Sequence, residues 1–222
     1  MNTPHPQKIT TNPGQQTPQG AESTVAGRYR ADITAGALKV VESRLIADLL
    51  LRGVDDSGWK QSIIGSNSLQ AKNPATAIRL ARLIRQRLET MSPEVWSMVR
   101  DGTVVVATHA LLAAAIKHSL LLGDFLDLTV RDHHRCFGKA LSKKVWIDFL
   151  QDCRGRDPLM PQWRESTIRR MGSSVFQILA QGGYIQDTRT MLLQRPHITT
   201  DVLNYLKRNH EAYVLRCITV GT

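Results

Sequence analysis

The chain is poor in cysteine, which excludes two common ways of stabilising a small fold. It contains only Cys136, Cys153 and Cys217, and no two of them form a CxxC pair. A disulfide framework or a structural zinc site needs paired or closely spaced cysteines. We therefore expect a hydrophobic core rather than cross-links to hold the fold, and a reducing cytoplasm as the location.

Catalytic signatures are absent as well. The 222 residues contain no GxxxxGK[ST] or GxGxxG phosphate loop, no GxSxG turn, no HExxH motif and no conspicuous carboxylate cluster for two metal ions. The adjacent His133 and His134 would point about 100° apart on a helix, which disfavours a shared metal ion. His109 lies in an apolar segment, as structural histidines do. We expect a protein that is not an enzyme and that uses no metal, cofactor or small-molecule substrate.

No apolar run is long enough to cross a bilayer. The best candidate, VVVATHALLAAAI at 104–116, would span about 20 Å as a helix, against a hydrocarbon core of ~30 Å. Lys117 and His118 follow it directly. The run predicts a buried central helix and no membrane partner.

Acidic residues are fewer than basic ones. The sequence holds 29 Lys and Arg against 19 Asp and Glu, a formal net charge of +10. Residues 28–100 carry 12 bases and 7 acids, 151–222 carry 10 and 6, and 101–150 carry 6 and 5, so the surplus lies toward the ends. Such a surplus attracts nucleic acid or another anionic surface.

What the sequence does contain is a series of helical patterns. Apolar residues recur every three or four positions, often after a capping residue, in most segments between residues 42 and 216. The expected fold is mainly α and multi-helical, with helix-turn-helix or winged-helix-like ends around a central helical bundle. A short hairpin at 184–194 is the expected minor β element, and residues 28–36 are expected to be extended like a short strand.

Four regions are expected along the chain. Residues 1–27, rich in Pro, Gln and Thr, predict a disordered tail. Residues 28–100 predict an N-terminal helical, helix-turn-helix-like region, and 101–155 predict the central bundle. Residues 156–222, which begin within the Pro-rich stretch GRDPLMPQW, predict a C-terminal winged-helix-like region.

PATAIRLARLIRQRL, residues 74–88, predicts a first contact helix. Asn73 is a good N-cap and Pro74 suits the first helical position. One side of the helix is apolar, and Arg87 on that side is expected to reach solvent by its long stem. The opposite side carries long polar donors: Arg79, Arg82, Arg85 and Gln86. Forked guanidinium groups without neighbouring acids suit phosphates and guanine edges.

Residues 166–181 predict a second contact helix. Its apolar stripe is Ile168, Met171, Val175, Ile178 and Leu179, and its polar stripe is Arg170, Ser173, Ser174, Gln177 and Gln181. Serine and glutamine can donate and accept at base edges, and Arg189 in the hairpin turn would touch the backbone as a wing does. Weaker candidates for neutralising phosphates are Arg169, Arg195, Lys207 and Arg208. The alternative for both helices is a polar face that only meets water.

Several longer strings resemble one protein family over about residues 28–220. They are YRADITAG, ESRLIADLLL, ATAIRLARLIRQRLETM, AAIKHSLLLGDFLDLTVRD and AYVLRCITV, and they are similar to the BrxA family of BREX (bacteriophage exclusion) defence operons. The resemblance implies a mainly helical, non-enzymatic protein of the bacterial cytoplasm that binds double-stranded DNA beside the operon's methyltransferase and other components. It brings no short catalytic motif that could be carried across residue by residue.

These observations together predict a non-catalytic component of a BREX system that binds double-stranded DNA mainly through phosphate contacts, with other BREX components as further candidate partners. One alternative is an assembly adaptor whose basic faces dock acidic patches on those components. Another is a binder of structured RNA, because some family members are likened to helical antitermination proteins. The aromatic content of 5% offers few stacking platforms for single strands.

Overall fold

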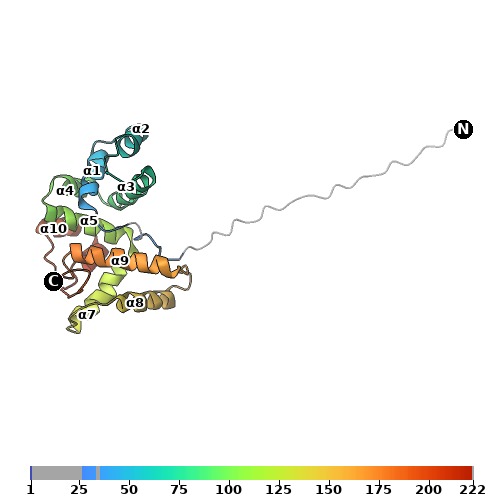
Figure 1. Ribbon diagram of the computed structural model, residues 1–222. Helices are drawn as coiled ribbons and strands as arrows, with labels where there is room; N and C mark the ends of the chain where they lie inside the picture. Colours follow the sequence, from blue (N-terminus) through green and yellow to red (C-terminus); the bar gives the residue numbers. More distant parts are fainter. Residues whose placement is uncertain (2–26, 34–35, 222) are drawn as a thin grey trace.

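The computed structural model describes Met1, residues 27–33 and residues 36–221. The predicted disordered tail, 1–27, lies outside these residues except at its two ends. The described chain is mainly helical, as predicted, and most of its helices pack around or close to the central helix α5 (Val104–His118) (Figure 1).

The first helices form the upper part of the molecule in Figure 1. They are α1 (Val40–Leu51), α2 (Asp56–Lys60) with its π-helical continuation η1 (Gln61–Gly65), α3 (Pro74–Leu88) and α4 (Pro93–Asp101). The predicted cap of α3 is present, because the Asn73 side chain accepts the backbone N–H of Thr76 at 2.8 Å. α3 contacts η1, α1 and α5, which places its apolar side against the core.

The apolar run forms the buried central helix that it predicted. Thr103 caps α5, and every residue from 107 to 116 is buried. His109 has a structural role there, since its Nδ1 accepts the backbone N–H of Thr199 at 3.2 Å. The chain continues as α6 (Leu120–Asp124), η2 (Phe125–Val130) and α7 (Arg131–Arg135). Within the described residues no single helix is long and apolar enough to cross a membrane; only α5 taken together with 120–135, bent by 105°, meets that test.

The C-terminal part begins with two helices in the lower half of Figure 1, α8 (Lys143–Arg156) and α9 (Glu165–Gln181). The expected hairpin at 184–194 is reduced to isolated antiparallel bridges, Ile185 with Leu193 and Ala140 with Leu192. Met191 has a φ of 52°, which interrupts an extended run, and no longer strand occurs in the part of the chain described. The chain closes with α10 (Thr200–Arg208) and α11 (Ala212–Ile218).

Residues 28–33 form no strand, contrary to the expectation. Side chains hold this segment instead: Arg28 and Tyr29 donate to Oδ2 of Asp124 at 2.8 and 2.7 Å. Oδ1 of the same buried carboxylate accepts the hydroxyl of Tyr213 at 2.8 Å. A buried carboxylate with several donors is well satisfied, so this cluster links the segment to α6 and α11 without a backbone ladder.

Arg87 also departs from expectation, because its head group is buried rather than in solvent. The residue is 4% exposed, and its guanidinium donates to the carbonyls of Ala37 at 3.0 Å and Gly36 at 3.3 Å. Burial lowers the pKa of Arg87 to about 10, although the neighbouring Asp32 carboxylate favours the charged form. The carbonyls ahead of α1 supply internal acceptors that a helix considered alone does not show.

Candidate nucleic-acid interface

The outer side of α3 carries the predicted polar groups. Arg79, Arg82 and Gln86 are exposed. Among the described residues no carboxylate lies within ion-pair distance of Arg79 or Arg82. Both guanidinium groups are therefore available to a ligand in solution.

Arg85, one turn further on, is held by its own protein. Its Nε donates to Glu89 Oε1 at 2.7 Å, and its guanidinium lies 4.6 Å from the centre of the Trp59 ring. Arg82 and Arg85 line a hollow of about 400 Å³ together with Trp59, Lys60, Ile63, Ile64 and Ile78. Arg85 thus joins α3 to α2, and the free positive charge on α3 is carried by Arg79 and Arg82.

Fewer residues of the predicted polar stripe of α9 are available at the surface than its sequence indicated. Its apolar stripe is buried as expected, but Ser174 and Phe176 are buried too, at 5% and 4% exposure. Placing Ser174 in the outer stripe was wrong, because α9 packs against α8 on one side and the core on another, and so buries a wide arc. Gln181 is engaged as well, accepting the N–H of Leu38 at 3.0 Å. The remaining exposed groups are Arg169, Arg170, Ser173 and Gln177.

Three of these groups line a groove of about 920 Å³ between α8, α9 and the turn before Met191. The polar groups that border the groove are Lys143, Lys144, Asp148, Gln151, Arg169, Ser173, Gln177 and Thr188, and Trp146, Ile147, Phe176 and Met191 contribute apolar lining. Gly172 allows the two helices to approach, since a Cβ there would lie 2.8 Å from Cδ1 of Trp146. Trp146 in turn donates its indole N–H to the carbonyl of Ile168 at 3.1 Å. We call this the α8/α9 groove.

The cations at the α8/α9 groove are only weakly engaged. Lys144 pairs with Asp148 at 2.7 Å and Arg169 with Glu165 at 3.6 Å, in both cases between exposed side chains on one helix. Such surface pairs contribute little, about 0.3–0.5 kcal/mol, and exchange readily with an external anion. Lys143 has no carboxylate within ion-pair distance among the described residues. The rim therefore presents positive charge and hydrogen-bond donors together.

The turn at 187–190 holds Arg189 close to the α8/α9 groove. The Asp187 carboxylate accepts the backbone N–H groups of Arg189 and Thr190, each at 2.7 Å. These backbone hydrogen bonds, that of Thr190 first, lower the pKa of Asp187. The Arg189 side chain is exposed and has no carboxylate within ion-pair distance in the described chain, and the same is true of Arg170 on α9.

Arg195 belongs to a different hollow. It lines a cavity of about 480 Å³ with Arg131, His134, Arg135, Thr219 and Gly221. Arg131 is bound to Asp127 at 3.0 Å. Burial, and then the nearby Arg195, lower the pKa of His134, which favours its neutral form. The structure therefore separates Arg195 from the groove that contains Arg169.

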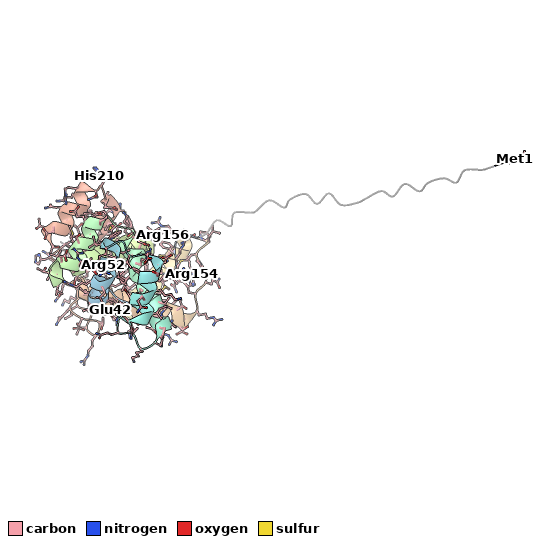
Figure 2. The ribbon with its side chains drawn as sticks, turned by 90° about the horizontal axis from the view of Figure 1, so that it is seen from above. Met1, Glu42, Arg52, Arg154, Arg156 and His210 are labelled. Atoms are coloured by element: carbon pink, nitrogen blue, oxygen red, sulfur yellow. The ribbon has the colours of Figure 1, made fainter. Side chains whose placement is uncertain are left out.

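The two predicted residues on α10 lie apart from both surfaces. Lys207 is exposed, whereas Arg208 pairs with Glu94 at 2.5 Å. α10 packs against α11 and α5. Figure 2 shows His210, just after α10, and Arg154, near the end of α8, at different edges of the molecule.

Sequence reasoning missed the contribution of α8 to the site. Lys143 and Lys144 border the groove, whereas the sequence predicts only a central bundle for residues 101–155, which include them. The available signal was the pair of lysines directly after Ser142, which caps α8 by accepting the N–H of Val145. A helix N-terminus with two lysines favours an anion.

Comparison with known proteins places the chain in a family. The sequence matches the BrxA family over residues 27–210. The chain belongs to the BrxA family. It is 52% identical to the BREX protein BrxA of Paramagnetospirillum magneticum over 194 residues, which covers 87% of this chain and 98% of the relative. It is 33% identical to the BREX protein BrxA of Escherichia coli over 177 residues, 80% of this chain and 83% of the relative.

A solved structure has a similar fold. The crystal structure of an uncharacterized protein from Magnetospirillum magneticum aligns with a TM-score of 0.80 at 50% identity, over 87% of this chain and 99% of that one. The match to the BrxA family includes α3, α8 and α9. Both candidate surfaces of this BrxA-family member therefore lie within the region that defines the family.

Proposed function

We propose that this BrxA-family chain is a component of a BREX phage-defence system in the bacterial cytoplasm, and that it binds double-stranded DNA without catalysing a reaction. Two relatives, at 52% and 33% identity, are named BREX proteins, which supports the first part. The DNA-binding part rests on the charge and geometry of the two surfaces.

One observation carries the DNA proposal: exposed cations that have no internal partner border both surfaces. Arg79 and Arg82 on α3 and Lys143 at the α8/α9 groove are free of carboxylates among the described residues. Each cation that neutralises a DNA phosphate releases condensed counterions, and this supplies most of the affinity in sequence-independent binding. On α3, a surface built only to be solvated would place acids beside Arg79 and Arg82.

The groups beside the cations suggest how a duplex is positioned. Lys143 and Arg169 would contact phosphates, which fix register without reading sequence. Ser173 and Gln177 lie on the exposed edge of α9. Their side chains are short, so they would contact base edges in a DNA groove only if α9 approached the duplex closely. We expect modest sequence discrimination and a strong dependence on ionic strength.

The test compares two double variants that lose the same charge. Arg79→Ala with Arg82→Ala removes two unpaired cations from α3 and should weaken binding to every duplex by about tenfold at low salt, whatever its sequence. The control, Lys39→Ala with Arg52→Ala, removes two exposed cations that pair with Glu42 and Asp48. It should change affinity much less. Equal losses of duplex affinity in the two variants would show that only net charge matters. Unchanged binding by the folded α3 variant would exclude α3 from the interface.

A second double variant examines the other surface. Lys143→Ala with Arg169→Ala should weaken duplex binding to a similar extent, because both cations border the α8/α9 groove. Fluorescence anisotropy with a labelled duplex measures both series. Circular dichroism on the same samples confirms that the variants remain helical.

A different function, assembly with other BREX components, is favoured by the apolar hollow beside α3. Ile64 and Ile78 line it and are 38% and 47% exposed. A pull-down of BREX components that survives nuclease treatment and is lost in an Ile64→Ser, Ile78→Ser variant would favour an adaptor. Tighter binding to a structured RNA than to a duplex of equal length would favour the RNA function instead.

A further inference from the structure

The turn that follows α7 carries an aromatic residue, Phe137, whose side chain the fold leaves exposed. The backbone N–H of Phe137 bonds to the carbonyl of His134 at 3.2 Å, and that of Gly138 bonds to the carbonyl of His133 at 2.8 Å. This pair of bonds is the Schellman motif, in which the residue in the left-handed conformation is usually glycine. Here that residue is Phe137, with a φ of 55°, and the glycine is its neighbour.

Phe137 destabilises the folded state at this position. A bulky side chain with positive φ is strained, and the ring recovers no burial in return, because it is 89% exposed. Within the described chain only Met1 is a more exposed large apolar residue. The turn lies at the lower edge of the molecule in Figure 1. Folding alone would favour a glycine at this position.

Two exposed cations flank the ring. Arg135 and Lys139 flank Phe137, are exposed, and have no carboxylate within ion-pair distance in the described residues. Arg135 shares the cavity of about 480 Å³ with Arg195 and Arg131. The nearest acid on α7 is Asp132, whose carboxylate lies 3.9 Å from the Cys136 sulfur. An exposed apolar ring between free cations is complementary to a polyanion that also offers flat apolar faces.

The turn is also connected to the α8/α9 groove. The N–H of Leu193 bonds to the carbonyl of Lys139 at 3.0 Å, and the N–H of Leu141 bonds to the carbonyl of Met191 at 2.9 Å. Met191 and Lys143 both line the groove. Phe137 therefore projects from a turn that is fixed, through these bonds, to the groove rim.

We propose that Phe137 is a wedge that inserts beside a base step of bound duplex DNA, while Arg135, Lys139 and Arg195 hold the flanking phosphates. This inference rests on the proposed DNA-binding function and deepens it. Apolar wedges between base pairs unstack the step and bend the duplex, and cations on either side secure the backbone of the bent form. Aromatic stacking on a base also tolerates any sequence, in agreement with the weak discrimination expected of the phosphate contacts.

The experiment uses the full chain and duplexes in which 2-aminopurine replaces adenine at successive positions. The fluorescence of 2-aminopurine rises where a base step is unstacked. Duplexes labelled at both ends report bending by energy transfer between the two labels. Wild type should raise the fluorescence at a small number of adjacent steps and shorten the end-to-end distance. Phe137→Ala should abolish both signals and weaken binding at least about fivefold.

A second variant separates the wedge from any effect on folding. Phe137→Gly relieves the positive-φ strain, so it should unfold at a higher urea concentration than wild type while losing the same DNA signals. Leu159→Ala is the matched control, because Leu159 is 56% exposed and follows α8 rather than α7. It should leave both DNA signals unchanged.

The outcomes distinguish this inference from the proposed function. If wild type binds duplexes but no step gains fluorescence, or if Phe137→Gly keeps the signal, the wedge is wrong and DNA binding stands. If wild type binds no duplex at any salt concentration, both fail. Binding to vesicles containing phosphatidylglycerol that depends on Phe137, without any change in 2-aminopurine fluorescence, would assign the ring to a lipid surface and overturn the wedge.

Discussion

Two arginines on one helix, α3, differ in whether their charge faces solvent or is used inside the protein. Arg82 faces solvent without an ion-pair partner in the described chain, whereas Arg87 is buried and donates to two backbone carbonyls. The sequence placed both on α3 and predicted the outer position of Arg82. It could not predict the acceptors of Arg87, because they come from residues 36 and 37, about fifty positions earlier.

Arg87→Ala should destabilise the protein by about 3 kcal/mol or more, because it leaves buried carbonyls without a donor and removes the counter-charge of Asp32. Urea unfolding monitored by circular dichroism measures the loss. Arg82→Ala, on the exposed side of the same helix, should stay within about 0.5 kcal/mol of wild type. Similar losses in the two variants would contradict the buried role of Arg87.

Three histidines that are buried or partly buried predict how stability depends on pH. Burial lowers the folded-state pKa values of His109, His118 and His134 below the ordinary histidine value of about 6.5. The unfolded chain therefore binds protons first as the pH falls. Stability is full above about pH 6.5, declines as the pH drops toward the lower folded-state values, and levels off below them.

A single variant tests this behaviour. His109→Gln keeps an acceptor for the N–H of Thr199 but cannot be protonated, so the loss of stability between about pH 7 and pH 5 should be shallower than in wild type. One histidine accounts for at most about 1.4 kcal/mol per pH unit. The measurement is the urea midpoint of unfolding at several pH values across this range. If the midpoints of variant and wild type fall equally with pH, His109 makes no contribution.

At the scale of elements, local signals predicted the helices better than the connections between them. Asn73 caps α3 as its sequence indicated, and the apolar run from 104 became the buried α5. The hairpin expected at 184–194 is reduced to one internal bridge, Ile185 with Leu193, and a second bridge joins Leu192 to Ala140, because Met191 turns the chain out of the extended conformation. The exposed edge of α9 was overestimated, since its contact with α8 cannot be derived from the periodicity of one helix.

The contact between α8 and α9 gives an element-scale prediction. Gly172→Ala places a methyl group 2.8 Å from Trp146, whereas Gly155→Ala, on α8, meets nothing within 4 Å. We expect Gly172→Ala to cost about 1–3 kcal/mol through overpacking, and Gly155→Ala to stabilise by up to about 1 kcal/mol through helix propensity. Thermal unfolding of the two variants measures the contrast, and stabilisation by both would show that the helices are not in close contact.

At the scale of the whole molecule, the sequence predicted a mainly helical protein with surplus positive charge, and the family assignment agrees with its resemblance to BrxA. Its division into four regions remains a prediction. What the sequence could not provide is the assembly of the α8/α9 groove, which joins Lys143 from the nearly neutral middle of the chain to Arg169 from the basic C-terminal part. Net charge counted by sequence region therefore did not predict which cations lie together in the fold.

We propose that unpaired cations on α3 and at the α8/α9 groove bind the phosphates of duplex DNA, and a salt titration of duplex affinity tests this most directly. Between about 50 and about 200 mM salt, the logarithm of the binding constant for wild type should fall with the logarithm of salt concentration with a slope of about −3 to −5. The Arg79→Ala, Arg82→Ala variant should bind with a slope smaller in magnitude by about 2, as expected for two lost phosphate contacts. A wild-type affinity that does not change with salt, or identical slopes for wild type and the α3 variant, would contradict the account.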